Sequence, residues 1–77
     1  MPFDVDQLSQ KLLLQIKEKW GVGETNNTLI TLDDEEKPFS KAIAANLEHA
    51  LCSEYPRSLV IVRVDAFSRI EITQRRK

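Results

Sequence analysis

The chain is poor in cysteine, glycine and aromatic residues: its 77 residues include one cysteine, two glycines, one tryptophan and one tyrosine. The single cysteine, Cys52, cannot form an internal disulfide bond. Unbroken apolar stretches such as Leu12–Leu14 and Leu59–Val62 are far shorter than the roughly 20 residues that cross a membrane. Residues 1–6 lack the basic and apolar segments of a signal peptide. These absences favour a reducing, cytoplasmic location.

Side chains that carry catalysis or bind metals are also scarce, because His49 is the single histidine. His49 and Cys52 are three residues apart and could share one helix face. A thiol nucleophile also needs an orienting third group and an oxyanion site, and the sequence identifies neither. Two ligands do not complete a zinc site, and Gly21-Val22-Gly23 lacks the third glycine of a nucleotide-binding loop. We therefore predict no catalytic residue, no cofactor, no metal site and no enzymatic activity.

The length and composition fit one small soluble domain that spans residues 1–77. The hydrophobic fraction is 42% and the charged fraction is 30%, as in a globular chain. A chain of this size buries only about 60% of its unfolded surface, so a single modest core is expected. There is room for a binding surface, but little for a deep pocket and the residues that would support catalysis in it.

An amphipathic helix is predicted over residues 5–20. Its apolar residues recur at spacings of three and four, which places Val5, Leu8, Leu12, Ile16 and Trp20 on one face. Asp4, with Gln7 three residues later, is a capping-box arrangement, and Gly21 occupies the position at which helices end. Leu14 points away from the stripe, either as an isolated exposed leucine or as a contact point for a partner.

A short strand and a second helix are predicted next. Thr28–Leu32 is rich in β-branched residues and follows a polar loop, which favours a strand. Pro38 suits a first helical turn, and the helix is expected to run from Phe39 to about Glu54, before Tyr55-Pro56. The residues predicted to face inward are Phe39, Ile43, Leu47, Ala50 and Leu51.

The end of the chain is predicted to form a β-hairpin, because residues 58–65 and 69–74 both alternate between apolar and polar side chains. A three-residue loop, residues 66–68, sets the register. It pairs Val64 with Ile70, Val62 with Ile72, Asp65 with Arg69 and Arg63 with Glu71. A two-residue loop would place Arg69 on the core face, so the longer loop is preferred.

These elements predict an α+β domain with the order helix, strand, helix, strand, strand. We expect a two-layer sandwich with both helices on one face of a three-stranded mixed sheet. The strand–helix–strand segment is expected to form a right-handed parallel crossover, and the C-terminal hairpin to add an antiparallel strand. The basic tail, residues 74–77, is expected to fray.

The sheet face away from the helices is predicted to be only half polar, with Leu59, Ile61, Arg63, Glu71 and Thr73 on it. An uncovered face with exposed aliphatic residues is typical of a surface that binds a partner protein or a second copy of the chain. Alternatively, the long stems of arginine and glutamate cover the aliphatic groups, and the face is simply solvated.

Charge is distributed unevenly. Residues 1–56 carry five lysines and ten carboxylates, a net charge of −5, whereas residues 57–77 carry six basic groups and two carboxylates, a net charge of +4. Pairing within the hairpin accounts for Arg63 and Arg69. The cations left over are Arg57, Arg75, Arg76 and Lys77. This basic edge could bind an acidic protein surface or a phosphate backbone, or it could serve solubility alone.

The acidic turn, residues 33–36, has three interpretations. Carboxylates at the start of a helix complement its dipole. The same residues could form a patch for a basic partner, including the basic edge of a second copy, or they could attract a hard cation. The glycine-containing loop pattern of a calcium site is absent.

Residues 45–73 resemble the helix–hairpin segment of the DinI-like DNA-damage-response modulators. The resemblance lies in a helix followed by Glu54-Tyr55-Pro56, Leu59-Val60-Ile61-Val62-Arg63 and Ile70-Glu71-Ile72. Those proteins modulate a recombinase filament by protein contact. That family opens with a strand and closes with an acidic helix, whereas this chain is predicted to open with a helix and closes with Gln74-Arg75-Arg76-Lys77.

We therefore expect a small regulator or adaptor that binds another protein or a second copy of itself, without membrane contact. The predicted contact residues are the basic edge (Arg57, Arg75, Arg76, Lys77), the open sheet face (Leu59, Ile61, Arg63) and the acidic turn (Asp33, Asp34, Glu35, Glu36). The alternative function is a nucleic-acid-binding module that uses the basic edge. The net charge of −1 and the shortage of aromatic residues disfavour it.

Overall fold

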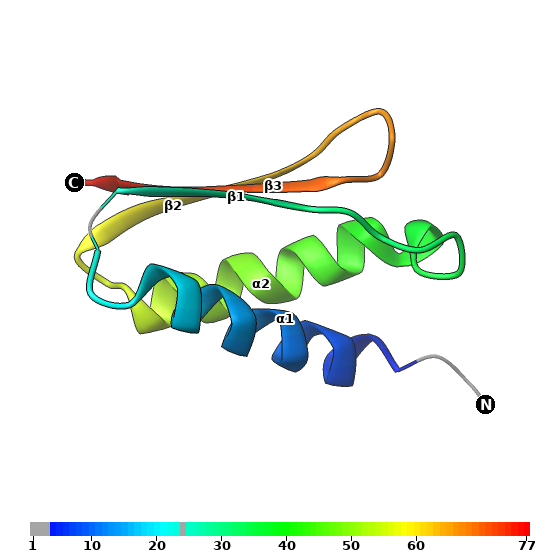
Figure 1. The fold of residues 1–77 in the computed structure, drawn as a ribbon, viewed down its shortest axis with the longest axis horizontal. Coiled ribbons are helices and arrows are strands. Elements are labelled where there is room, and N and C mark those ends of the chain that lie inside the picture. Colours follow the sequence, from blue (N-terminus) through cyan, green and yellow to red (C-terminus); the bar gives the residue numbers. More distant parts are fainter. Residues whose placement is uncertain (1–3, 24) are drawn as a thin grey trace.

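In the computed structural model, which describes residues 4–23 and 25–77, two helices cover one face of a three-stranded sheet (Figure 1). The elements are α1 Val5–Trp20, β1 Asn26–Ile30, the short 3₁₀ helix η1 Lys37–Phe39, α2 Ser40–Glu54, β2 Ser58–Val64 and β3 Ile70–Arg76. The α+β class, the order of helices and strands, and the placement of both helices on one face are therefore confirmed.

Helix α1 begins and ends where the sequence predicts. The Asp4 carboxylate accepts hydrogen bonds from the backbone N–H groups of Asp6 and Gln7, at 3.0 and 3.2 Å. These bonds satisfy two of the donors that the first turn of a helix leaves unpaired. Gly21 ends the helix with a φ of +56°, a left-handed conformation that favours glycine.

The start of α2 differs from the prediction. Residues Lys37–Phe39 form a single 3₁₀ turn, and α2 begins at Ser40. Phe39, which was predicted to face inward, is 40% exposed, because a turn of three residues rotates its side chain away from the buried stripe of the following α-helix. Ala44 lies in the core instead, beside Ile43 and Leu47.

Strand β1 lies two residues earlier than predicted, at Asn26–Ile30 instead of Thr28–Leu32. Its first two residues belong to the strand because their side-chain amides bond to β3. Asn26 Nδ2 donates to Gln74 Oε1 at 2.8 Å, and Asn27 Nδ2 donates to Thr73 Oγ1 at 3.3 Å. Cross-strand bonds of this kind override the low strand propensity of asparagine.

The prediction of a mixed sheet is wrong, because the strand order is β1-β3-β2 and both pairings are antiparallel. Strands β1 and β2 run in the same direction, but β3 lies between them. The connection through α2 therefore spans two strand positions. This is sterically natural, since a helix is about 10 Å wide and strands are about 4.8 Å apart.

The hairpin register is confirmed at every position that both strands share. Val64 pairs with Ile70, Val62 with Ile72 and Arg63 with Glu71. In the loop, Asp65 N donates to Arg69 O at 3.0 Å. Ser68 has a φ of +59°, as expected when a three-residue hairpin loop ends on a left-handed residue.

Two positions with positive φ provide a matched test of backbone strain. Gly21→Ala is expected to destabilise the fold by about 1 kcal/mol, because no atom lies within 4 Å of the added Cβ and left-handed strain is the main cost. Ser68→Gly is expected to stabilise it by about 0.5 kcal/mol, since the relief of strain outweighs the added entropy of the unfolded chain. Urea denaturation of both variants measures these changes, and a stabilising Gly21→Ala would contradict them.

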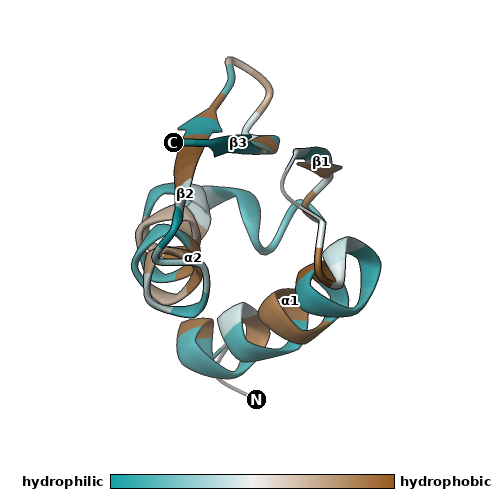
Figure 2. Cartoon of the chain, turned by 90° about the vertical axis from the view of Figure 1, so that its left-hand side faces the viewer, coloured by the Kyte–Doolittle hydropathy of each residue, from teal (hydrophilic) through white to brown (hydrophobic). Residues whose placement is uncertain are grey.

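The core lies between the sheet and the helices. Figure 2 shows these two layers, viewed from the end of the molecule that holds the C-terminus. Its residues are Ile16, Trp20, Leu32, Ile43, Ala44, Leu47, Leu51, Val60, Ile70 and Ile72. The indole of Trp20 donates from Nε1 to Thr28 Oγ1 at 2.8 Å, so the polar groups of both side chains are satisfied inside the core.

The two helices run parallel, and the charge of the molecule differs between the ends at which they begin and finish. Both begin at the end of the molecule that holds the acidic turn, and both finish at the end that holds the C-terminus (Figure 1). Carboxylates stabilise the positive start of a helix dipole and cations stabilise its negative end. Asp4, Asp6 and residues 33–36 lie at the first end, and the basic edge lies at the second.

Candidate functional site

The open face is the side of the sheet opposite α1 and α2 (Figures 1 and 2). Strand alternation and register assign it Asn27 and Leu29 from β1, Leu59, Ile61 and Arg63 from β2, and Glu71, Thr73 and Arg75 from β3. Leu29 and Leu59 are 51% and 47% exposed. Leu29 was missed by the sequence interpretation, although the apolar run Leu29-Ile30 signals that β1 has an apolar residue on each face.

The centre of the open face, on β3, is polar, and its apolar residues lie on the two edge strands together with Asn27 and Arg63. Arg75 lies opposite Leu59, Thr73 lies between Asn27 and Ile61, and Glu71 lies between Leu29 and Arg63. A shallow depression of about 190 Å³ follows the central residues. Although Arg63 and Glu71 are register partners, the ion pairs of the described residues do not include them. Arg63 is therefore available to a partner, contrary to the pairing predicted from the register.

The hairpin loop holds its own ion pair, as predicted. Arg69 Nε donates to Asp65 Oδ2 at 2.7 Å, and the Arg69 guanidinium also lies 5.2 Å from the centre of the Phe67 ring. Asp65 Oδ1 accepts from the backbone N–H groups of Phe67 and Arg69. The backbone hydrogen bond from Arg69 is the main reason that the pKa of Asp65 lies below its ordinary value of 3.8.

Replacing Asp65 by alanine is expected to lower the melting temperature at neutral pH. The pKa of Asp65 is lower in the folded state than its ordinary value of 3.8. Asp65 therefore contributes fully to the stability of the fold above pH 3.8, and this contribution disappears as the pH falls through the folded pKa. The two proteins should therefore converge in acid, once the pH is well below the folded value. Thermal melts at neutral pH and in acid test this, and a gap that does not narrow in acid would show that the carboxylate charge is not the cause.

The basic edge is divided by the sheet rather than gathered into one cluster. Arg75 lies on the open face, whereas Arg57 and Arg76 line a cavity on the helix side. Lys77 Nζ donates to Pro56 O at 3.1 Å. Residues 74–77 were predicted to fray, whereas in the structure β3 continues through Arg76 and Gln74 is only 1% exposed.

Gln74 joins all three strands at this end of the sheet. It accepts from Asn26 Nδ2 at 2.8 Å and donates through Nε2 to Ser58 Oγ at 3.0 Å. This buried side chain was treated as part of a polar tail in the sequence interpretation. Its partner Asn26 is 48 positions away, and only the alternation of Ile70, Ile72 and Gln74 could have pointed to its burial.

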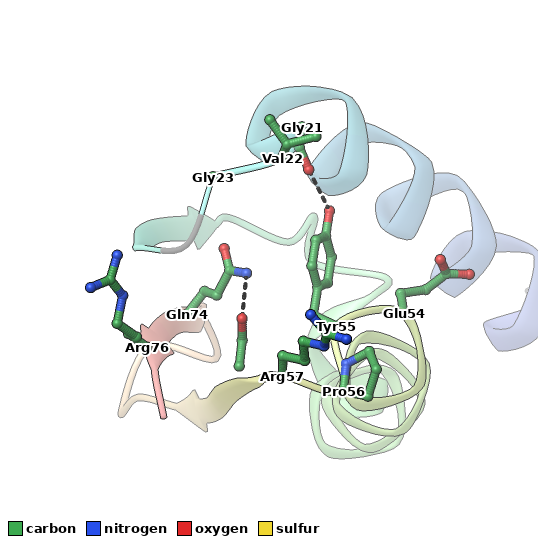
Figure 3. Close-up of a pocket in the computed structure, with 10 residues that line it drawn as sticks. Gly21, Val22, Gly23, Glu54, Tyr55, Pro56, Arg57, Gln74 and Arg76 are labelled. Carbon is green, nitrogen blue, oxygen red and sulfur yellow. Dashed lines mark hydrogen bonds between the residues drawn. The ribbon is translucent and has the colours of Figure 1, made fainter.

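The end cavity, of about 380 Å³, lies beside Gln74, where both helices finish (Figure 3). It is lined by Gly21, Val22, Gly23, Glu54, Tyr55, Pro56, Arg57, Ser58, Gln74 and Arg76. Tyr55 crosses the gap between the helix ends, since its ring lies 5.7 Å from that of Trp20 and its hydroxyl donates to Gly21 O at 3.3 Å.

The acidic turn lies at the opposite end of the molecule from the basic edge (Figure 1). Glu36 Oε1 accepts from Asp33 N at 2.8 Å, and Lys37 pairs with Asp34 at 3.2 Å. A contact between the acidic turn of one copy and the basic edge of another would therefore join opposite ends. Such a contact closes in an antiparallel pair or a ring, or extends into an open chain, depending on the angle between the copies.

The structure brings together no constellation for chemistry within the described residues. His49 and Cys52 are both exposed on α2, and no group of three potential metal ligands occurs among residues 4–23 and 25–77. None of the helices in that part of the chain is long and apolar enough to span a membrane. Comparison with protein-family models, curated proteins and solved structures found no match, so the resemblance of residues 45–73 supplies no family.

Proposed function

We propose that the chain is a non-enzymatic protein-interaction domain, a regulator or adaptor, that binds its partner through the open face. The observation that carries the proposal is the exposure of Leu29 and Leu59 on the face of the sheet that the helices leave uncovered. Exposed aliphatic groups beside charged ones are typical of protein interfaces.

The charges on the open face indicate the kind of partner. Arg63 and Arg75 outnumber the single carboxylate, Glu71. Arginine forms bidentate hydrogen bonds with carboxylates and contributes strongly to interfaces. A protein surface with apolar groups flanked by aspartate or glutamate is the best match. The acidic turn, at the far end of the molecule, is not part of this surface.

The nucleic-acid alternative receives less support from the open face. Sheets that bind single strands stack bases on aromatic side chains, and the eight residues assigned to the open face include no aromatic one. The aromatic residues Trp20 and Tyr55 lie on the helix side, and Phe67 is in the hairpin loop.

The proposal is tested with one leucine on each side of the molecule. Leu59→Glu on the open face is expected to reduce partner retention from a lysate of the producing cells at least tenfold, because it places a carboxylate in the apolar part of the interface. Leu14→Glu is the matched control, since Leu14 is 65% exposed on α1. Equal retention by both variants would contradict the proposal. Binding of a labelled oligonucleotide at low salt that is lost in Arg75→Ala would favour the alternative.

A further inference from the structure

The end cavity presents one arginine whose hydrogen-bonding groups are not used by the fold. Arg57 lines the cavity, is exposed, and takes part in none of the hydrogen bonds or ion pairs of the described residues. Arg76, across Gln74 in Figure 3, already has an interaction of its own. The free guanidinium of Arg57 favours an anionic ligand.

Several carbonyl groups around the cavity, where two helices end, are already engaged. Each of four nearby carbonyls already accepts a hydrogen bond. The pairs are Gly23 N to Trp20 O, Tyr55 Oη to Gly21 O, Ser58 N to Tyr55 O, and Lys77 Nζ to Pro56 O. The carboxylate of Glu54 is held by Lys17 Nζ at 3.1 Å. Of the charged side chains that line the cavity, Arg57 is therefore the one whose guanidinium remains for a ligand.

The chemistry of the cavity favours a carboxylate over a phosphate. Phosphate sites commonly use converging backbone N–H groups at the N-terminus of a helix. At this cavity lie the C-termini of α1 and α2 instead. The walls are also partly apolar, with the fully exposed side chain of Val22 and the ring of Tyr55. The volume of about 380 Å³ suits a small group, since ligand pockets begin at roughly 300 Å³.

We propose that the end cavity binds a carboxylate that carries a short apolar group, which is the chemistry of a peptide C-terminus. Arg57 holds the carboxylate with its guanidinium fork, and the apolar group lies against Val22 and Tyr55. This site goes beyond the proposed function, because it lies on the helix side of the sheet and includes no residue of the open face. Either site can therefore fail without the other.

The test compares two ligands that differ at the carboxyl group alone, N-acetylleucine and its uncharged amide, with inorganic phosphate as a third probe. Two-dimensional NMR of the isotope-labelled full chain follows the side-chain signals of Arg57 and Gln74. We expect the acid to shift both signals in a saturable way. The amide is expected to bind about tenfold more weakly, because a charge-assisted hydrogen bond is lost.

Variants identify the residue responsible. Arg57→Ala is expected to weaken binding of the acid about tenfold, and Arg57→Lys, which retains charge without the fork, to have an intermediate effect. Arg63→Ala, on the open face, is the control and should bind like the wild type. Thermal melts show whether each variant is folded, which is expected because Arg57 and Arg63 are both exposed.

Four results would overturn the proposal: equal affinity for acid and amide, unchanged binding by Arg57→Ala, phosphate shifting the same signals as strongly, or no shift with any probe. A tetrapeptide that ends in the same leucine with a free carboxyl group then identifies the source of the ligand. Tighter binding than that of N-acetylleucine assigns the cavity to peptide C-termini, and equal affinity assigns it to small carboxylic acids.

Discussion

Replacing Gln74 by alanine is expected to destabilise the protein by about 3 kcal/mol. The side chain is 1% exposed and lies in the central strand, so its removal leaves a cavity beside the core. It also leaves Asn26 Nδ2 and Ser58 Oγ without the partners they have in the folded protein. An unsatisfied buried group costs about 1–3 kcal/mol, and these two are only partly buried.

A second substitution separates the packing of Gln74 from its hydrogen bonds. Gln74→Leu refills much of the volume but bonds to neither Asn26 nor Ser58, so we expect it to recover about 1 kcal/mol and no more. Gln15→Ala, at an exposed position of α1, is the control and should change stability by less than about 0.5 kcal/mol. Urea denaturation measures all three. Complete recovery by leucine would show that the hydrogen-bond network contributes nothing.

Replacing Leu47 by alanine is expected to cost about 3 kcal/mol, within the range measured for buried leucines. Leu47 is fully buried in the middle of α2. The expected total stability is roughly 4–12 kcal/mol at 0.05–0.15 kcal/mol per residue, so one such loss is a large fraction of it. The melting temperature should consequently fall by more than ten degrees, at about 4–8 °C per kcal/mol.

The control for Leu47 is the same substitution at Leu14, which is 65% exposed on α1. Both leucines are in helices and both become alanine, so the change in helix propensity is the same in the two variants. Leu14→Ala should shift stability by less than about 0.5 kcal/mol. Similar losses at the two positions would contradict the assignment of the core to the space between the sheet and the helices.

Local features of the fold could be predicted from the sequence because neighbouring residues determine them. The bounds of α1 follow from its apolar spacing, from the Asp4 cap and from Gly21. The hairpin register follows from alternation and from the length of the loop. In both, the residues that decide the structure are close in sequence: Asp4 and Gly21 are 17 positions apart, and the outermost hairpin pair, Ser58 and Arg76, is 18 apart.

The features that the sequence did not reveal depend on distant residues. The position of β3 between β1 and β2 is set by pairing between residues that are 40 to 48 positions apart. The same pairing buries Gln74, lengthens β1 to Asn26 and adds Leu29 to the open face. No pattern within β1 or β3 alone specifies which strand each will contact.

The structure also changes the meaning of the basic segment. Five arginines near the end of a chain suggest a single cationic surface, but alternation sends their side chains to both faces of the sheet. Arg69 pairs with Asp65, Arg63 and Arg75 lie on the open face, and Arg57 and Arg76 line the end cavity. A substitution at one of these arginines therefore tests one surface and leaves the others unchanged.

Photo-crosslinking tests the central claim, which is that the open face binds the partner, most directly. A photoreactive phenylalanine analogue is placed at Leu29 on the open face and, separately, at Leu14 on α1, two positions that are both more than half exposed. After irradiation in a lysate of the producing cells, the account predicts a discrete crosslinked protein for the variant at Leu29 and not for the variant at Leu14. A discrete product at Leu14 alone, or the same products at both positions, would contradict it.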